Sequence, residues 1–386
     1  MKICYCLNNI QNFGGIEKIT KLKAQLIAEE KGFETYIIVT DLKKKCPSLD
    51  LCEKVNLINL DVNYGDINAN NLFLYLVKLL QKKYIHFSKL RKKLKEIKPD
   101  IVVSTGMSEK ILMPLIKGDF KKIWELHFCA HKNRIENSNK NFFYRKIYSF
   151  IDKIGALISS HYYDCIVTLT KEDKELNWVN NKKVIIIPNF HTIQTTTLAS
   201  LENKKVLAIG RLTPQKNFSS LIKAFCLVVK KYPDWELDIY GDGELKEQLA
   251  QEIHKNELTN NVFLKGNTNQ IKEKLQEYSI FVLSSIYEGM PIAMLEAISS
   301  GLPVVSYNCP TGPKDIIIDT ECGFLVPMNN EETLSQKILY LIDNADERKR
   351  MGFEAFKRSK DFHAEKIIQE WLNLYCYLNE NCLLSQ

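Results

Sequence analysis

Residues 280–308 read IFVLSSIYEGMPIAMLEAISSGLPVVSYN. The stretch begins with a mostly apolar run at 280–285, continues with residues of helical composition at 291–300, and ends with a second apolar run at 303–308. Two apolar runs on either side of a helix are typical of parallel strands joined by a crossover helix. The stretch therefore predicts one strand–helix–strand unit of a parallel sheet.

The same alternation continues on both sides of this unit. Upstream it predicts strands and helices in turn, with strands at 205–211, 235–241 and 261–266 and helices at 217–232, 244–255 and 270–277. In the front half it predicts a helix from Glu17 to Glu30 and strands at 2–8, 35–41, 100–106, 122–128, 165–170 and 183–189. Such strands, apolar on both faces and alternating with helices, indicate parallel sheets that are covered on both sides.

A polar, threonine-rich stretch at 191–203 separates the two halves of the pattern. We therefore expect an α/β protein with two doubly wound, Rossmann-like domains, at 1–190 and at 191–364, facing each other across a cleft. The last segment, 365–386, is apolar at helical spacing and is expected to complete the first domain. Open α/β sheets bind ligands outside the carboxyl ends of their strands, so a site is expected in the cleft.

The composition excludes several classes of protein. Of the 386 residues, 45% are hydrophobic and 26% are charged, which excludes fibrous, collagen-like and wholly disordered chains. No apolar run reaches the roughly 18 residues of a membrane span, and the start turns polar too early for a secretory signal, so we expect a cytoplasmic protein. The 11 cysteines are scattered, without zinc-ligand spacing, and predict reduced thiols and no structural metal.

Charge is distributed unevenly between the two halves. Residues 1–190 carry 32 Lys/Arg and 20 Asp/Glu, whereas the remainder carries 21 and 26. Within the basic half, residues 77–98 hold nine Lys/Arg and one Glu, with apolar residues interleaved at near-helical spacing. This pattern fits either a solvated amphipathic helix or a helix that binds an anionic membrane surface. Nucleic acid is not expected as a partner, because no nucleic-acid-binding motif accompanies the charge.

Two glutamates flank the start of the helix expected at 291–300. Glu288 lies in the loop before Pro291, a residue that suits the first turn of a helix. Glu296 lies about one and a half turns inside the helix. The helix dipole and the free N–H groups of this segment form an anion site suited to a phosphate, the donors being Gly289, Met290 and Ile292. Carboxylates beside such a site need hydrogen-bond donors, which sugar hydroxyls supply; taken alone, the two would be a helix-stabilising charge and a solvated side chain.

Further motifs accompany the glutamates in order along the chain. The string EGMPIAMLEAISSGLPVV (288–305) is accompanied by GGIEK (14–18), AIGRLTPQKNF (208–218), IYGDGE (239–244), GPKDII (312–317) and CGFLVP (322–327). Together these strings resemble the retaining GT-B glycosyltransferases of the large GT4-type family, the group 1 glycosyltransferases. The resemblance covers essentially the whole chain. It implies a GT-B fold, with a first domain that binds the acceptor and a second that binds a nucleotide-sugar donor.

The resemblance also implies roles for matching residues in the second domain. Arg211 and Lys216 would hold the diphosphate of the donor, which suits a planar guanidinium and a flexible ammonium. Glu288 would accept hydrogen bonds from hydroxyls of the transferred sugar, and Glu296 from the ribose. The residues between them that begin the helix would complete the donor site; these are Gly289, Met290, Pro291 and Ile292.

In the first domain, the resemblance implies donor contacts and a catalytic histidine. Gly14 and Gly15 would let the backbone approach the donor, because a Cβ would clash there. His127 matches the family's active-site histidine, near the reacting sugar. Glu125 is expected to pair with the backbone. Lys18 stands where the family more often has Arg, so no contact is assigned to it.

These residues predict an enzyme that needs no metal ion and no cofactor. The chain contains no Asp-x-Asp pair, and Arg211, Lys216 and a helix N-terminus would offset the charge of a leaving diphosphate. The expected reaction moves a sugar, with retention, from a nucleoside-diphosphate-sugar, with a UDP-sugar as the first expectation. The acceptor would be a glycan, as in lipid-linked intermediates of capsule or lipopolysaccharide biosynthesis at the inner face of the cytoplasmic membrane.

Three alternatives differ in chemistry. A nucleotide-sugar epimerase or a phosphorylase would use the same two-domain fold. A catalytically silent protein would bind nucleotide or glycan without turnover. A dinucleotide oxidoreductase would need a GxGxxG turn after the first strand, which NNIQNFGGI (8–16) does not supply.

Overall fold

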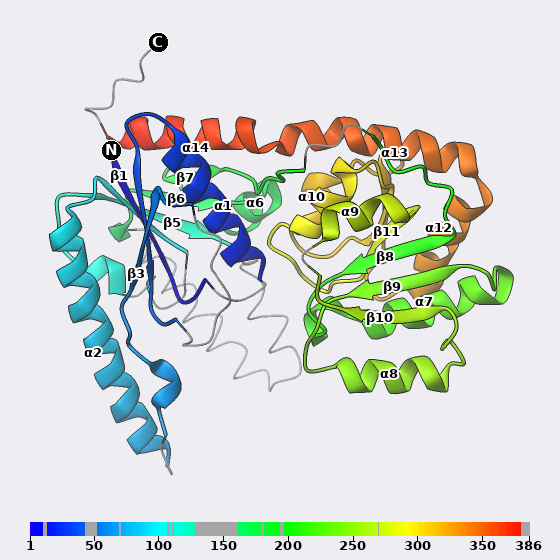
Figure 1. Ribbon diagram of the computed structural model, residues 1–386, viewed down its shortest axis with the longest axis horizontal. Coiled ribbons are helices and arrows are strands. Elements are labelled where there is room, and N and C mark those ends of the chain that lie inside the picture. Colours follow the sequence, from blue (N-terminus) through cyan, green and yellow to red (C-terminus); the bar gives the residue numbers. More distant parts are fainter. Residues whose placement is uncertain are drawn as a thin grey trace.

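The computed structural model describes residues 1–10, 14–42, 52–68, 71–105, 109, 112–127, 161–178, 181–193, 197–268 and 270–379. These residues form two separate parallel sheets, each flanked by helices (Figure 1). The expected α/β architecture with two doubly wound sheets is therefore confirmed.

The first sheet has seven parallel strands in the order β3-β2-β1-β4-β5-β6-β7. They are β1 (Lys2–Leu7), β2 (Glu34–Val39), β3 (Val55–Asn59), β4 (Ile101–Ser104), β5 (Lys121–Leu126), β6 (Cys165–Thr168) and β7 (Val184–Ile186). The chain builds outward from β1 in one direction and then crosses over to β4. A crevice at the carboxyl ends of β1 and β4 is the usual ligand position in such a sheet.

The second sheet has six parallel strands in the order β10-β9-β8-β11-β12-β13. They are β8 (Lys205–Ile209), β9 (Glu236–Tyr240), β10 (Val262–Gly266), β11 (Ile280–Leu283), β12 (Val304–Tyr307) and β13 (Gly323–Val326). The order reverses between β8 and β11. The segments with Arg211 and Glu288 follow these two strands, so the topology brings them to one edge of the sheet.

Helices cover both sheets. They are α1 (Gly15–Glu29), α2 (Leu72–Ile97), α6 (Lys171–Asn177), α7 (Phe218–Lys231), α8 (Lys246–Lys255), α9 (Ile271–Lys274), α10 (Ile292–Ser299), α11 (Pro313–Ile316), α12 (Glu331–Asp343), α13 (Ala345–Ser359) and α14 (Ala364–Leu378). Helix α1 begins two residues before the predicted Glu17, with Gly14 as its N-cap. Among the described residues, no helix is both long enough and apolar enough to cross a membrane.

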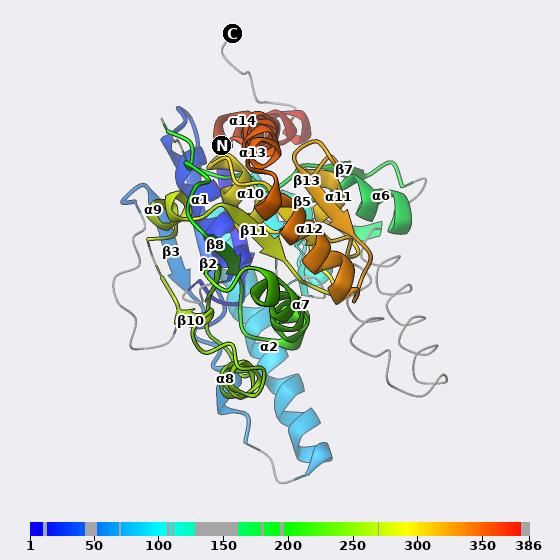
Figure 2. The same cartoon turned by 90° about the vertical axis from the view of Figure 1, so that its right-hand side faces the viewer.

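The C-terminal helix α14 packs against the first sheet. Trp371 and Tyr375 of α14 are buried in one core with Ile3 and Tyr5 of β1. Figure 1 shows α14 (red) running across the top of the first sheet, next to α1, and Figure 2 shows α13 and α14 along the same upper side of the molecule. The chain thus returns from the second sheet to finish the core of the first.

Two strands were not predicted, and each lies at the edge of its sheet. Strand β3 reads VNLIN, with only Val55 buried, because an edge strand packs on fewer neighbours. Strand β13 is four residues long and begins with Gly323, where a Cβ would lie 2.3 Å from the carbonyl oxygen of Val304. Short or half-covered edge strands carry a weak apolar pattern, which explains both omissions.

Candidate active site

The turn after β8 carries Arg211 and Lys216 and is fixed by the turn after β9. The N–H of Gly210 donates to Tyr240 O at 2.9 Å, and the N–H of Leu212 donates to Asp242 O at 3.0 Å. Arg211 is exposed, and its guanidinium has no hydrogen-bond partner among the residues described. This leaves a planar cation free to bind an anion at the edge of the second sheet.

Lys216 and Glu288 form a direct ion pair. The ammonium of Lys216 lies 2.5 Å from Glu288 Oε1, and the hydroxyl of Ser285 donates to the same oxygen at 2.5 Å. Glu288 is only 6% exposed, and Thr311 Oγ1 donates to its carbonyl oxygen. The cation and the hydroxyl thus offset the cost of burying this carboxylate.

The N-terminus of α10 lies beside this ion pair. Pro291 is the N-cap, with φ −72° and ψ 109°, and the helix begins at Ile292, so the expectation that Pro291 lies within the first turn was wrong by one residue. The N–H groups of Gly289, Met290 and Ile292 donate to no acceptor in the described part of the chain. They remain available to an anion, and the helix dipole favours one there.

Gly312 and Asn189 hold the loop before α10 from two sides. Gly312 has φ +96°, and a Cβ there would lie 2.7 Å from Pro291 Cδ and 3.1 Å from Gly289 O. Asn189 Nδ2, from the segment after β7, donates to Met290 O at 3.0 Å. The side chain of Met290 is buried, so this residue offers only its N–H group to a ligand.

Glu296 faces the first sheet rather than solvent. It is 7% exposed, and the ammonium of Lys18 on α1 donates to its Oε1. Lys18 itself is half exposed. The alternative that Glu296 is a solvated surface charge is therefore wrong, and Lys18, to which no contact was assigned, lies next to the site.

The two glycines at the start of α1 bring this helix close to α10. Gly14 is the N-cap in ordinary extended conformation, with φ −83° and ψ 155°. At Gly15, a Cβ would lie 3.2 Å from Ile292 Cδ1, which is tighter than ordinary contact. Gly15 thus lets the N-termini of α1 and α10 approach each other, whereas a Cβ at Gly14 would meet the side chain of Glu17.

His127 follows β5 and belongs to a buried charged group. Its Nε2 lies 3.3 Å from Glu125 Oε1, and the ammonium of Lys23 donates to both carboxylate oxygens of Glu125 at 2.6 Å. All three residues are buried. Glu125 therefore pairs with side chains, and the expectation that it would pair with the backbone was wrong.

Opposing effects set the ionisation of this group. Burial alone would raise the pKa of Glu125, but the positive charge of Lys23 and the neighbouring His127 outweigh burial and lower the pKa to about 2. Burial lowers the pKa of Lys23, and the charge of Glu125 opposes that effect. The carboxylate beside His127 is therefore ionised at neutral pH.

Sequence reasoning missed Lys18, Lys23, Ser285 and Thr311. A signal existed for Lys23, because it lies four residues from both Ile19 and Ile27 on the buried face of α1. A lysine on an apolar stripe is unusual unless it is paired. The apolar pattern does not mark the other three residues: Lys18 and Thr311 contact partners far away in the sequence, and Ser285 contacts Glu288 three residues further on.

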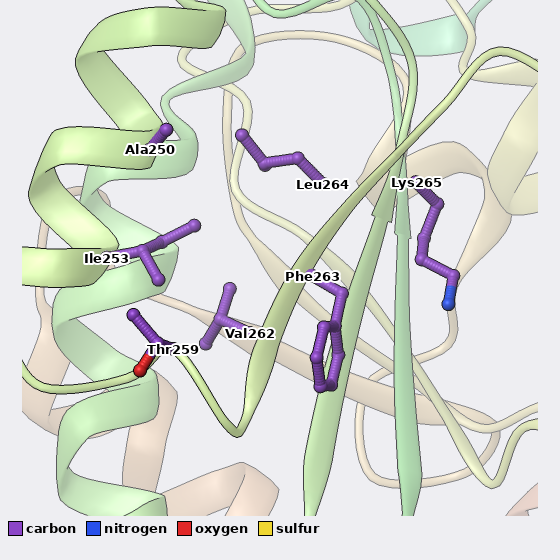
Figure 3. A pocket seen from close by; sticks show the side chains of 7 residues that line it. All are labelled: Ala250, Ile253, Thr259, Val262, Phe263, Leu264 and Lys265. Carbon is purple, nitrogen blue, oxygen red and sulfur yellow. The ribbon is translucent and has the colours of Figure 1, made fainter.

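Two other features of the structure bear on the location of the site. A surface hollow of about 400 Å³ lies between α8 and β10, lined by Ile253, Val262 and Lys265 among others, and Figure 3 shows these side chains. None of the predicted site residues lines it. In the described ranges, no group of three or more His, Cys, Asp or Glu residues could hold a metal ion.

Comparisons with known proteins identify the family. The model of the family "Glycosyl transferases group 1" matches residues 190–358. An uncharacterized glycosyltransferase of Haemophilus influenzae is 32% identical over 379 residues, which are 96% of this chain and 98% of that protein. A poly(ribitol-phosphate) alpha-N-acetylglucosaminyltransferase of Staphylococcus aureus is 29% identical over 289 residues, 74% of this chain and 57% of that one.

A solved structure shows the same fold. The S. aureus protein TarM, crystallised as a mutant with UDP, alpha-GlcNAc-glycerol and fondaparinux, has a TM-score of 0.78 and 19% identity, covering 97% of this chain and 99% of that one. This likeness and the two parallel sheets confirm the expected GT-B fold. With a relative that is 32% identical over nearly its whole length, the chain belongs to the group 1 glycosyltransferases.

Proposed function

We propose that the protein transfers a sugar, with retention of configuration, from a UDP-sugar to a hydroxyl group of a glycan acceptor. One observation carries the proposal: an exposed guanidinium, the Lys216–Glu288 pair and the free N-terminus of α10 lie at one edge of the second sheet, where the buried Glu296 contacts α1 of the first domain. These groups are complementary to a nucleoside diphosphate attached to a sugar. UDP is proposed because the TarM structure was crystallised with UDP.

Each group has a definite task in this proposal. The N–H groups that start α10, with Arg211 and Lys216, hold the diphosphate and stabilise the negative charge that grows on it as the sugar C1–O bond breaks. Because two cations and a helix N-terminus offset this charge, the reaction is proposed to need no metal ion. Glu296 accepts from the ribose hydroxyls, and Glu288 accepts from the sugar. His127 accepts a hydrogen bond from a hydroxyl group of the sugar.

The proposed transfer takes place on one face of the sugar. The acceptor oxygen forms a bond to C1 on the face from which the diphosphate leaves, and the acceptor proton passes to an oxygen of the leaving diphosphate. Atoms and charge balance without a covalent enzyme intermediate. The acceptor is proposed to bind the first sheet as a lipid-linked glycan of surface polysaccharide synthesis, in keeping with the relative named for a poly(ribitol-phosphate) acceptor.

Turnover with defined substrates tests this function. Purified protein is incubated with UDP-sugars and with glycan or polyol-phosphate acceptors, and released UDP and the anomeric configuration of the product are measured. We expect UDP release only with an acceptor, and a product with the donor's anomeric configuration. An inverted product would contradict retention. Conversion of the donor sugar without acceptor would indicate an epimerase, and binding without turnover a silent protein.

We also propose that α2 binds the anionic surface of the membrane that carries such an acceptor. Its N-terminal half exposes four large apolar side chains on one face, with exposures of 77%, 47%, 66% and 72% for Phe73, Leu76, Leu80 and Tyr84. Figures 1 and 2 both show this end of α2 extending beyond the rest of the molecule. Exposed apolar residues in such numbers on one helix face are typical of an interaction surface.

The basic residues of α2 have two different roles. Lys78, Lys82 and Lys89 donate to backbone carbonyl groups of residues 60–68 and so fasten the helix to the domain. Arg91 and Lys95 are exposed and continue the face of Phe73 and Tyr84 at seven- and four-residue spacing. Each basic residue near an anionic bilayer contributes about 1 kcal/mol to binding.

Vesicle flotation tests the membrane proposal. We expect binding to vesicles that contain anionic lipid, and strong loss of binding in the triple variant Phe73→Ser/Leu80→Ser/Tyr84→Ser. Phe353→Ser, which removes an exposed aromatic ring from α13 on the other domain, is the matched control and should bind as the wild type does. Equal flotation of wild type and triple variant, or no binding at moderate salt, would refute the proposal.

A further inference from the structure

The buried group of Lys23, Glu125 and His127 is not used by the proposed transfer beyond His127 itself. Lys23 is 1% exposed and Glu125 is 2% exposed, so both charges lie in the interior of the first domain. Burying an ion pair rarely adds net stability compared with apolar residues of similar size. The contacts of this pair therefore indicate its function better than its stability does.

Lys23 is held on two sides. Its ammonium donates to both oxygens of Glu125 at 2.6 Å, and it lies 3.7 Å from the centre of the Trp371 ring of α14. The Tyr5 ring lies 5.4 Å from the same ammonium on another side. An aromatic face attracts a desolvated cation, so α14 helps to keep Lys23 charged and in place.

Glu125 in turn faces His127. The Nε2 atom of His127 lies 3.3 Å from Glu125 Oε1, is fully buried, and makes no aligned hydrogen bond with any residue that the structure describes. An N–H at Nε2 is attracted to the ionised carboxylate, whereas an unprotonated Nε2 would place its lone pair against a negative oxygen. The electrostatics therefore favour the tautomer with its proton on Nε2.

We infer that Lys23 and Glu125 are positioning residues that fix the ring orientation and the protonated nitrogen of His127. Lys23 keeps Glu125 ionised, Glu125 holds the proton of His127 on Nε2, and Nδ1 is left as the hydrogen-bond acceptor for a hydroxyl group of the sugar. The inference rests on the proposed function only where it assigns His127 a part in transfer. Helix α14 supports this arrangement, because its Trp371 ring contacts Lys23, which in turn pairs with Glu125 of β5.

The decisive variant removes both charges together. Lys23→Met/Glu125→Gln keeps the size of both side chains and leaves no unpaired buried charge, so it should fold where Lys23→Met alone is expected to be strongly destabilised. Tyr5→Phe is the matched control. It changes the same core, since Tyr5 OH lies 2.9 Å from Tyr375 OH, but it removes no charge.

The first readout needs no substrate. Nitrogen-15 NMR of histidine-labelled protein, with His127→Gln to assign the signal, distinguishes a proton on Nε2 from a proton on Nδ1. We expect the Nε2–H signature in the wild type and Tyr5→Phe, and a mixture of tautomers in the double variant. An unchanged His127 signature in the double variant would overturn the inference.

The second readout connects the pair to turnover. We expect a fall of about 10- to 100-fold in kcat with an unchanged donor KM, since the orientation of a catalytic histidine is lost while donor binding remains. Equal kcat in wild type and double variant would overturn the inference. If the wild type itself transfers no sugar, the proposed function fails, and the NMR result still decides whether the pair positions His127.

Discussion

At the scale of single residues, the ion pair between Lys216 and Glu288 joins stability to activity. Lys216 and Glu288 each occupy an ordinary position in their own motif. The structure places Lys216 Nζ 2.5 Å from Glu288 Oε1, and Glu288 is buried. A cation so placed can serve two anions in turn, the carboxylate in the resting protein and a diphosphate during reaction. If Lys216 binds the diphosphate as proposed, we expect its substitution to change two independent measurements.

Lys216→Ala is expected to lower both stability and transfer. Leaving the buried carboxylate of Glu288 without its cation costs about 1–3 kcal/mol, and loss of a group that stabilises a leaving diphosphate lowers kcat about 100- to 1,000-fold. Chemical denaturation and steady-state kinetics measure the two effects. Lys223→Ala, which removes an exposed lysine of α7, should change neither quantity. Wild-type kcat in Lys216→Ala would contradict the assigned role.

His86 predicts how stability depends on pH. Burial lowers its pKa from the ordinary 6.5 to about 4, although nearby Asp41 favours the charged form. Tyr64 OH lies 3.2 Å from His86 Nδ1, and Glu109, whose pKa is raised by burial, lies 3.9 Å from Nε2. Below pH 6.5 the unfolded chain takes up a proton at this position that the folded chain does not, so acidification favours unfolding.

The expected loss attributable to His86 between pH 7 and pH 4 is about 3 kcal/mol, at 1.36 kcal/mol for each pKa unit. Urea unfolding at several pH values, on wild type and His86→Gln, measures it. The difference in unfolding free energy between the two proteins should shift in favour of the variant as the pH falls from 6.5 to 4. A difference that is constant over this range would contradict a buried, neutral His86.

At the scale of elements, the turns after β8 and β9 fit together because glycines stand where a Cβ would clash with backbone, as at Gly241. Gly241 has φ +140°, and a Cβ there would lie 1.9 Å from Gly210 O, which is backbone and cannot move aside cheaply. Gly241→Ala is therefore expected to destabilise the protein by about 3 kcal/mol or more, combining conformational strain with a clash. It should also weaken donor binding, because the displaced turn carries Arg211.

Two other glycines distinguish backbone strain from a steric clash as the cause of the destabilisation. Gly32 also has a positive φ, +89°, but a Cβ there would meet nothing within 4 Å, so Gly32→Ala is expected to cost about 1 kcal/mol from backbone strain alone. Gly65 has neither a positive φ nor a near neighbour, so Gly65→Ala should be close to neutral. Similar stability losses in Gly241→Ala and Gly32→Ala, measured by thermal or urea unfolding, would refute the predicted clash.

At the scale of the whole molecule, the alternation of strands and helices predicted the fold but not its edges. Buried parallel strands such as β1 and β12 are apolar on both faces, and this pattern is visible in a single sequence. The edge strand β3 exposes part of its side chains and lacks the pattern. Strand order and the return of α14 to the first sheet depend on contacts between distant segments, which periodicity does not record.

In the candidate site, too, local motifs could be predicted from the sequence, whereas contacts between distant segments could not. Motifs in one segment, such as Glu288 and Glu296 around the start of α10, were predicted from the resemblance of the whole string to the family. Contacts between segments were not, because nothing in the local sequence of Lys18 indicates Glu296, 278 residues away. Lys23 was an exception, because the helical pattern of α1 could have revealed it as a charged residue on the buried face.

In the proposed donor complex, a nucleoside diphosphate binds between the turn after β8 and the start of α10, with its ribose on Glu296. Isothermal titration of UDP, with GDP and ADP for comparison, tests it on wild type, Glu296→Gln and Glu247→Gln. Glu247 is an exposed glutamate of α8 and serves as the matched control.

We predict that UDP binds the wild type and Glu247→Gln equally. Glu296→Gln should weaken binding about 10- to 100-fold, because a hydrogen bond to a charged group contributes about 1.5–3 kcal/mol. Absence of binding by all three nucleotides, or equal UDP affinity in wild type and Glu296→Gln, would contradict the account.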